Sequence, residues 1–146
     1  MATYVKYDAY VLDWVNGIYD WDGHVFKIML SNSAPNVATH HLRADAGVNE
    51  LSTSGGYTSG GNTTTITTSS SGTNPATAKV TGSDPTAWTG SGGGFTARYA
   101  ILYDDTPTAP ADPLVASWDY GSSQAVAAGE TFTVDLDNTN GIFTVT

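Results

Sequence analysis

The chain has 146 residues, of which 40% are hydrophobic and only 13% charged, and its 14 acidic and five basic residues give a net charge of −9. The apolar content excludes a disordered chain. The acidity opposes binding to nucleic acids and to anionic membranes, because both attract Lys and Arg. The absence of cysteine excludes disulfides, thiol catalysis and zinc–thiolate sites. We therefore expect a single domain over residues 1–146 that binds neither nucleic acid nor membrane.

The N-terminal segment has the apolar spacing of an amphipathic helix. Residues at positions i, i+3, i+4 and i+7 are Tyr7, Tyr10, Val11 and Trp14. This spacing predicts a short helix over about residues 4–16, and Asn16-Gly17 is a suitable stop because both residues tolerate positive φ. Alternation of apolar residues from Val5 to Val11 leaves a strand as the alternative. No signal peptide pattern is visible, so we expect a protein that is made and assembled in the cytoplasm.

The next third of the chain predicts strands joined by turns. Alternating apolar residues predict a strand at 25–30, and Thr39 and Gly47 flank a small helical turn. The Thr-rich stretch 62–69 suits a pleated surface and, with the alternating segment 76–82, predicts a hairpin. The alternative is a glycosylated linker between two domains. We prefer the hairpin because neither half of the chain has enough apolar residues for its own core.

The last third predicts four more strands. Alternating apolar residues mark segments 95–103, 114–120, 130–136 and 141–146, separated by Gly- and Pro-rich turns. The chain as a whole is therefore predicted to be mainly β, an antiparallel β-sandwich or small barrel of about seven or eight strands. The helix at 4–16 would pack on or beside it.

A search for catalytic or metal-binding patterns finds weak candidates only. The histidines are His24, His40 and His41, and adjacent histidines point too far apart to ligate one metal readily. The acidic segments 20–23 and 135–141 resemble calcium loops but lack the spacing of an EF-hand, so we interpret them as turns and leave a structural calcium as the alternative. We expect no enzyme, metal or cofactor. A pocket in which His24 or His40 meets a carboxylate would revive the enzyme hypothesis.

The aromatic residues allow two interpretations. Trp14, Trp88 and Trp118 are expected in the core, because aromatic side chains dominate core burial. Alternatively, Trp88, Tyr57 and Tyr103 lie beside predicted loops and would stack on sugars if exposed.

The order of these segments resembles a family of small tailed-bacteriophage virion proteins. The motifs are a short helix ending in NG, the DGHVFKIMLSNS strand, the GGYTSGG turn, ARYAILYDDT, DPLVASWDYGS and the final GETFTVDLDNTNGIFTVT. The resemblance covers most of the chain but departs from the family pattern in GTNPATAKVTGSDP. It brings no catalytic residues with it.

The resemblance implies a non-enzymatic β-sandwich protein of the capsid decoration, or cement, type. Such a protein would bind the major capsid protein on the outside of the virion, and we expect a homotrimer. Candidate protein-contact residues are Tyr4, Tyr7, Tyr10, Trp14 and Asn74. Two alternatives remain: a phage tail or fibre component that binds host-surface glycans, and a carbohydrate-binding or adhesion module.

Overall fold

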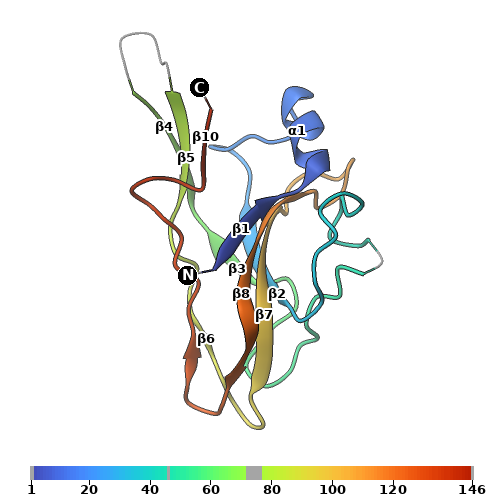
Figure 1. Cartoon of the computed structure of the whole chain (residues 1–146), viewed down its shortest axis with the longest axis vertical. Coiled ribbons are helices and arrows are strands. Elements are labelled where there is room, and N and C mark those ends of the chain that lie inside the picture. The colour runs from blue at the N-terminus through green and yellow to red at the C-terminus, as the bar shows by residue number, and fades with distance from the viewer. Residues whose placement is uncertain (1, 46, 72–76, 146) are drawn as a thin grey trace.

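Three antiparallel sheets make up the fold in a computed structural model, which describes residues 2–45, 47–71 and 77–145. The largest sheet has the strand order β1-β8-β7-β2-β3 (Figure 1). The second sheet has the order β10-β5-β4, and the third pairs β6 with β9. The strands are β1 (Thr3–Lys6), β2 (Phe26–Ser31), β3 (Asn62–Thr64), β4 (Ile66–Ser71), β5 (Thr77–Gly82), β6 (Trp88–Thr89), β7 (Phe95–Asp104), β8 (Leu114–Val126), β9 (Thr131–Phe132) and β10 (Phe143–Val145).

The predicted fold class is confirmed: 45% of the chain is strand and 6% is helix, consistent with a β-sandwich-like fold of about ten strands. Seven or eight strands were expected. The difference arises because residues 62–71 form two strands, and because β1 and the short β6 were not anticipated, whereas β9 lies within the strand predicted at 130–136.

The centre of the large sheet is apolar on both faces. Along β7, every residue from Tyr99 to Asp104 is buried, and β2 beside it is buried at all but one position. Strands covered on both sides lose the alternation of a half-exposed strand and become continuously apolar. The hydrophobic core therefore lies between this sheet and the segments that cross it. These segments contribute Val134, Leu136 and Ile142 to the core.

The Thr-rich stretch forms the predicted hairpin. β4 pairs with β5 from Ile66↔Gly82 to Ser71↔Thr77, and Figure 1 shows the two strands extending beside β10 away from the large sheet. Thr65 separates β3 from β4, so the chain passes there from the large sheet to the smaller one. Ile66 and Val80 are buried, whereas the threonine and serine side chains at 67–70 are exposed.

The N-terminal prediction needs correction. The helix α1 runs only from Asp8 to Val15, and residues 3–6, expected to begin it, form β1 against β8. Tyr7 has extended backbone angles and joins the two elements. Thr3 and Val5 are β-branched and favour a strand. The predicted stop is confirmed, because Asn16 caps the helix and Gly17 follows with φ of +72°.

The predicted additional helical turn lies slightly earlier than expected. The backbone N–H groups of Thr39 and His40 both donate to the Asn36 carbonyl, which closes one turn. The Asp45 N–H then donates to the Leu42 carbonyl and the Val48 N–H to the Asp45 carbonyl, and Leu42 bridges to Pro113. This segment therefore packs against the start of β8 through turns.

Candidate docking surface

The outward face of α1 is unusually apolar. Leu12 is 64% exposed and Val15 is 76% exposed, and Val11 and Trp14 are exposed as well. Only Tyr10 and Asp13 of this helix are buried. A contiguous exposed apolar patch is a common mark of an interaction surface on a soluble protein. We call Val11, Leu12, Trp14 and Val15 the helix patch.

The helix is fixed to the body by its two buried residues. The Tyr10 ring packs among aromatic rings, with centroids 5.4 Å from both Tyr19 and Phe143. Asp13 Oδ2 lies 2.6 Å from His41 Nε2. Because these contacts use one side of a short helix, the helix patch is left free and is held in a defined orientation.

Strand β1 contributes a sheet edge next to the helix. Among the strands that the structure describes, β1 pairs with β8 alone, and all four of its residues are exposed. The Tyr7 N–H donates to the Val115 carbonyl. Tyr7 therefore continues the hydrogen-bond ladder between β1 and β8, in which Val5 is paired with Ser117. Antiparallel pairing alternates, so the backbone N–H and C=O groups of Tyr4 and Lys6 point away from β8. Such an edge is a template for an additional strand.

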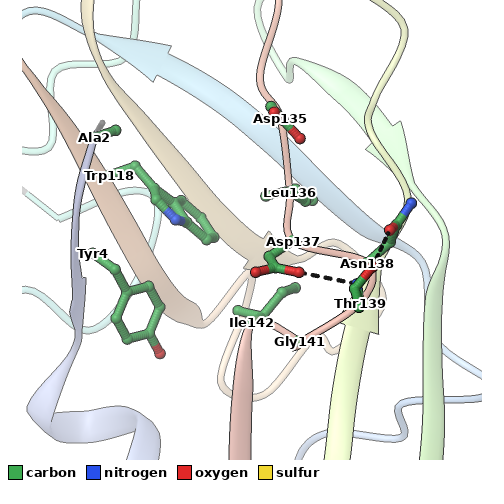
Figure 2. A pocket seen from close by; sticks show the side chains of 10 residues that line it. All are labelled: Ala2, Tyr4, Trp118, Asp135, Leu136, Asp137, Asn138, Thr139, Gly141 and Ile142. Carbon is green, nitrogen blue, oxygen red and sulfur yellow. Dashed lines mark hydrogen bonds between the residues drawn. The ribbon is translucent and has the colours of Figure 1, made fainter.

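Two of the hollows that border β1 share Tyr4. A groove of about 350 Å³ lies between β1, α1 and β10 and is lined by Tyr4, Lys6, Tyr10, Val11, Trp14 and residues 143–145. A cleft of about 550 Å³ continues along β1 on the same side (Figure 2). Its lining is Ala2, Tyr4, Trp118, Asp135, Leu136, Asp137, Asn138, Thr139, Gly141 and Ile142. Tyr4 and Lys6 of β1 thus line two neighbouring hollows, with Tyr4 between them.

The cleft is aromatic on one side and acidic on the other. Tyr4 and Trp118 form its aromatic wall, and Figure 2 shows the segment carrying Asp135 and Asp137 opposite them. The pKa of Asp137 lies below its ordinary value, chiefly because the Asn140 N–H donates to it. No Lys, Arg or His is among the lining residues. The lining of the cleft therefore carries two carboxylates and no cationic side chain beside two aromatic faces, and the nearby Lys79 charge contributes to the lowered pKa of Asp137.

The candidate contact residues divide into exposed and buried ones. Tyr4 is 37% exposed and Trp14 is 36% exposed, so both are accessible. Tyr7 and Tyr10 are buried, so they support the surface from beneath, although Tyr10 also borders the groove. Asn74 lies outside the described residues.

Other parts of this surface escaped the sequence analysis. Leu12 and Val15 were not singled out, although both are apolar positions of the predicted helix. Trp118 was expected in the core but is only partly buried. The pairing partner of Tyr4 is set by the register between β1 and β8, which the sequence does not display.

The histidine and acidic candidates have structural partners. His24 Nδ1 lies 2.6 Å from Asp104 Oδ2, so a histidine does meet a carboxylate, but Asp104 is fully buried and its other oxygen accepts the Thr106 N–H. Burial raises the pKa of Asp104. Asp20 and Asp137 each accept backbone N–H groups within their own turns. Among the described residues, no three His, Asp or Glu side chains are placed to hold a metal ion.

The aromatic residues proposed as a sugar platform are not on the surface. Tyr57, Trp88 and Tyr103 are all buried, with at most 3% of each exposed. That part of the glycan hypothesis is wrong, because all three side chains belong to the hydrophobic core. Trp88 is in the core as expected, whereas Trp14 is on the surface.

A scan against protein-family models, a search of curated proteins and a search of solved structures each found no match to this chain. Within the described residues, no helix has the length and apolar character that crossing a bilayer requires.

Proposed function

We propose that this chain is a non-enzymatic structural protein of a tailed-phage virion, which binds the outer surface of the capsid shell and stabilises it. The observation that carries the proposal is the helix patch beside the free edge of β1. A protein that acts by adhering to a shell needs such a surface. The resemblance to small phage virion proteins supplies the identity of the shell.

Charge and surface chemistry support an exterior position. A net charge of −9 opposes contact with packaged DNA and is acceptable outside the shell. The β4–β5 hairpin presents uncharged Thr and Ser side chains at 67–70, which are suited to hydrogen-bonded contacts. The major capsid protein is the proposed partner.

The proposed oligomer is a trimer. A 15.2 kDa chain placed around threefold positions of a shell would present three copies of the helix patch together. Size-exclusion chromatography with light scattering measures the mass directly. A monomer at micromolar concentration would contradict the trimer but leave shell binding to be tested separately.

A second candidate function is glycan binding by a phage tail or fibre component. The observation that favours it is the partly exposed aromatic pair of Tyr4 and Trp118 in an open cleft, because aromatic faces stack on sugars. A separate carbohydrate-binding or adhesion module would use the same pair.

Copy number in purified virions distinguishes these functions. Quantitative mass spectrometry of particles from the phage that encodes this chain should find a number of copies similar to that of the major capsid protein. A handful of copies per particle would contradict decoration and favour the tail. Complete absence from particles would exclude both virion functions.

A further inference from the structure

The cleft and the groove on either side of Tyr4 define a binding path along β1. Because the chain runs from Ala2 in the cleft through β1 to Lys6 in the groove, the two ends of this edge have different surroundings. The Ala2 end faces Asp135 and Asp137, and the Lys6 end faces Val11 and Trp14. A bound segment would therefore meet negative charge at one end and apolar surface at the other.

We propose that the free edge of β1 binds an extended segment of a partner protein in which a large apolar residue is followed, four positions later, by Arg or Lys. All strand pairings among the described residues are antiparallel, so we assign the added strand the same orientation. It would then run from the Lys6 end to the Ala2 end. Side chains at alternate positions would face these hollows, the apolar one at the helix patch and the basic one in the cleft.

The cleft favours a cation over a neutral ligand. Trp118 and Tyr4 offer aromatic faces, and cations are attracted to such faces. Asp135 is exposed, and no ion pair among the described residues involves it or Asp137. The Lys79 ammonium group donates to the Thr139 carbonyl, and its charge acts on Asp137, so Asp135 is the carboxylate that remains available to a ligand. A guanidinium group would both stack on an aromatic ring and pair with a carboxylate.

A second copy of this chain does not supply such a segment. The residues four positions before its five basic residues are Ala2, Gly23, Thr39, Pro75 and Gly94. None of these has a large apolar side chain. A second copy also carries the same net charge of −9, which opposes its approach to an acidic cleft. The occupant is therefore a different protein, and the proposal holds whether or not that protein belongs to a capsid.

The test is a titration of the ¹⁵N-labelled full chain with synthetic peptides, followed by NMR. The probe is Thr-Leu-Thr-Val-Thr-Arg-Thr. Its controls are the peptide with Glu in place of Arg and the peptide with Leu and Arg exchanged. We expect the probe to shift the amide signals of Tyr4 and Lys6 and to bind at least tenfold more tightly than either control. Equal binding of the three peptides, or no shifts up to millimolar peptide, would overturn the proposal.

Substitutions at Asp135 and at Lys6 test separately the contribution of the carboxylate in the cleft and that of the backbone edge of β1. Asp135→Asn should weaken probe binding five- to tenfold, whereas Asp22→Asn, an equal change in charge at another exposed loop, should leave it within twofold. Lys6→Pro removes an outward N–H that the β8 ladder does not use, and it should abolish the shift at Tyr4. If Asp22→Asn weakens binding as much as Asp135→Asn, the cleft is not the site.

Two further outcomes would show that the site binds something other than a segment of a different protein. Binding of neutral oligosaccharides on a glycan array, lost in Asp135→Asn, would assign the cleft to sugars and overturn the peptide proposal. Concentration-dependent self-association that Lys6→Pro prevents would assign the edge to a second copy and would also overturn it.

Discussion

Tyr4 and Trp118 face each other across β1 and β8, with ring centroids 5.6 Å apart and ring planes at 61°. They form a non-hydrogen-bonded pair, in which opposing side chains approach most closely. This edge-to-face contact holds the exposed strand β1 against the sheet. It also forms the aromatic wall of the cleft.

Removing the Tyr4 ring should loosen β1 without unfolding the protein. We expect Tyr4→Ala to lower the free energy of unfolding by about 1 kcal/mol, the scale of an aromatic cross-strand pair. Urea denaturation measures the change. Tyr4→Phe keeps the ring and should match the wild type. A similar loss in both variants would show that the hydroxyl, and not the ring contact, stabilises the strand.

The Tyr10 hydroxyl is buried and has no hydrogen-bond partner among the described residues. A buried unsatisfied polar group is unfavourable, so Tyr10→Phe should leave stability unchanged or raise it by up to about 1 kcal/mol. Tyr10→Ala removes the ring that anchors α1 and should cost about 3–5 kcal/mol. Thermal and urea unfolding test both. If Tyr10→Phe lowers the free energy of unfolding by more than about 1 kcal/mol, the result would contradict a Tyr10 hydroxyl that is buried without a hydrogen-bond partner.

Glu50 should make stability depend on pH in the acid range. Burial alone would raise its pKa, but hydrogen bonds from Tyr57, Arg43 and the Gly60 N–H outweigh burial and lower the pKa below its ordinary value. A carboxyl whose pKa is lowered by folding stabilises the protein above its unfolded pKa, about 4.3, and loses that contribution as pH falls through the folded value.

The Glu50→Gln variant tests this network. At pH 7 it should lower the free energy of unfolding by about 2–3 kcal/mol, because Arg43 loses the nearer of its two carboxylate partners and keeps only the longer contact to Asp112. Near pH 3 the difference from wild type should narrow. Glu130→Gln, at an exposed turn, is the control and should change stability by less than about 1 kcal/mol. A difference that stays constant between these pH values would contradict the ionised network.

The fold class was visible in the sequence because alternation at 95–103 and turn residues at regular intervals are local signals. The predicted start of the N-terminal helix was wrong, because helical spacing at Tyr7, Tyr10, Val11 and Trp14 does not show where a helix begins. The spacing therefore could not show whether residues 3–6 belong to the helix. Pairing with β8, a contact distant in sequence, decided for a strand.

The same limit applies to the surface. The sequence analysis named Tyr4 and Trp14 as contact residues, and the structure leaves both exposed. Helical spacing, however, does not show which side of the helix faces the core. The helix turns Tyr10 and Asp13 inward and leaves Leu12 and Val15 exposed. Likewise, the cleft joins Tyr4, Trp118 and Asp135, three residues brought together only by strand register and by the path of the last loop.

The helix patch can be altered without disturbing the core. Leu12→Glu with Val15→Glu changes only strongly exposed positions, so the free energy of unfolding should stay within about 0.5 kcal/mol of wild type per substitution. The matched control is Thr67→Glu with Ser69→Glu on the β4 strand, which adds the same charge at exposed positions. Circular dichroism and urea denaturation establish that each variant is folded before binding is compared.

The central claim is that the helix patch docks on the capsid. It is tested most directly by measuring how many copies of the wild type and of the two double variants bind to capsids that lack this chain. Capsids purified from a phage deleted for the chain are incubated with each protein, and bound copies are counted by mass spectrometry. We predict saturable binding of the wild type and the Thr67/Ser69 control, and at least tenfold weaker binding of the Leu12/Val15 variant. Equal occupancy by both variants would contradict docking through the helix patch, and no binding of the folded wild type would contradict the capsid function itself.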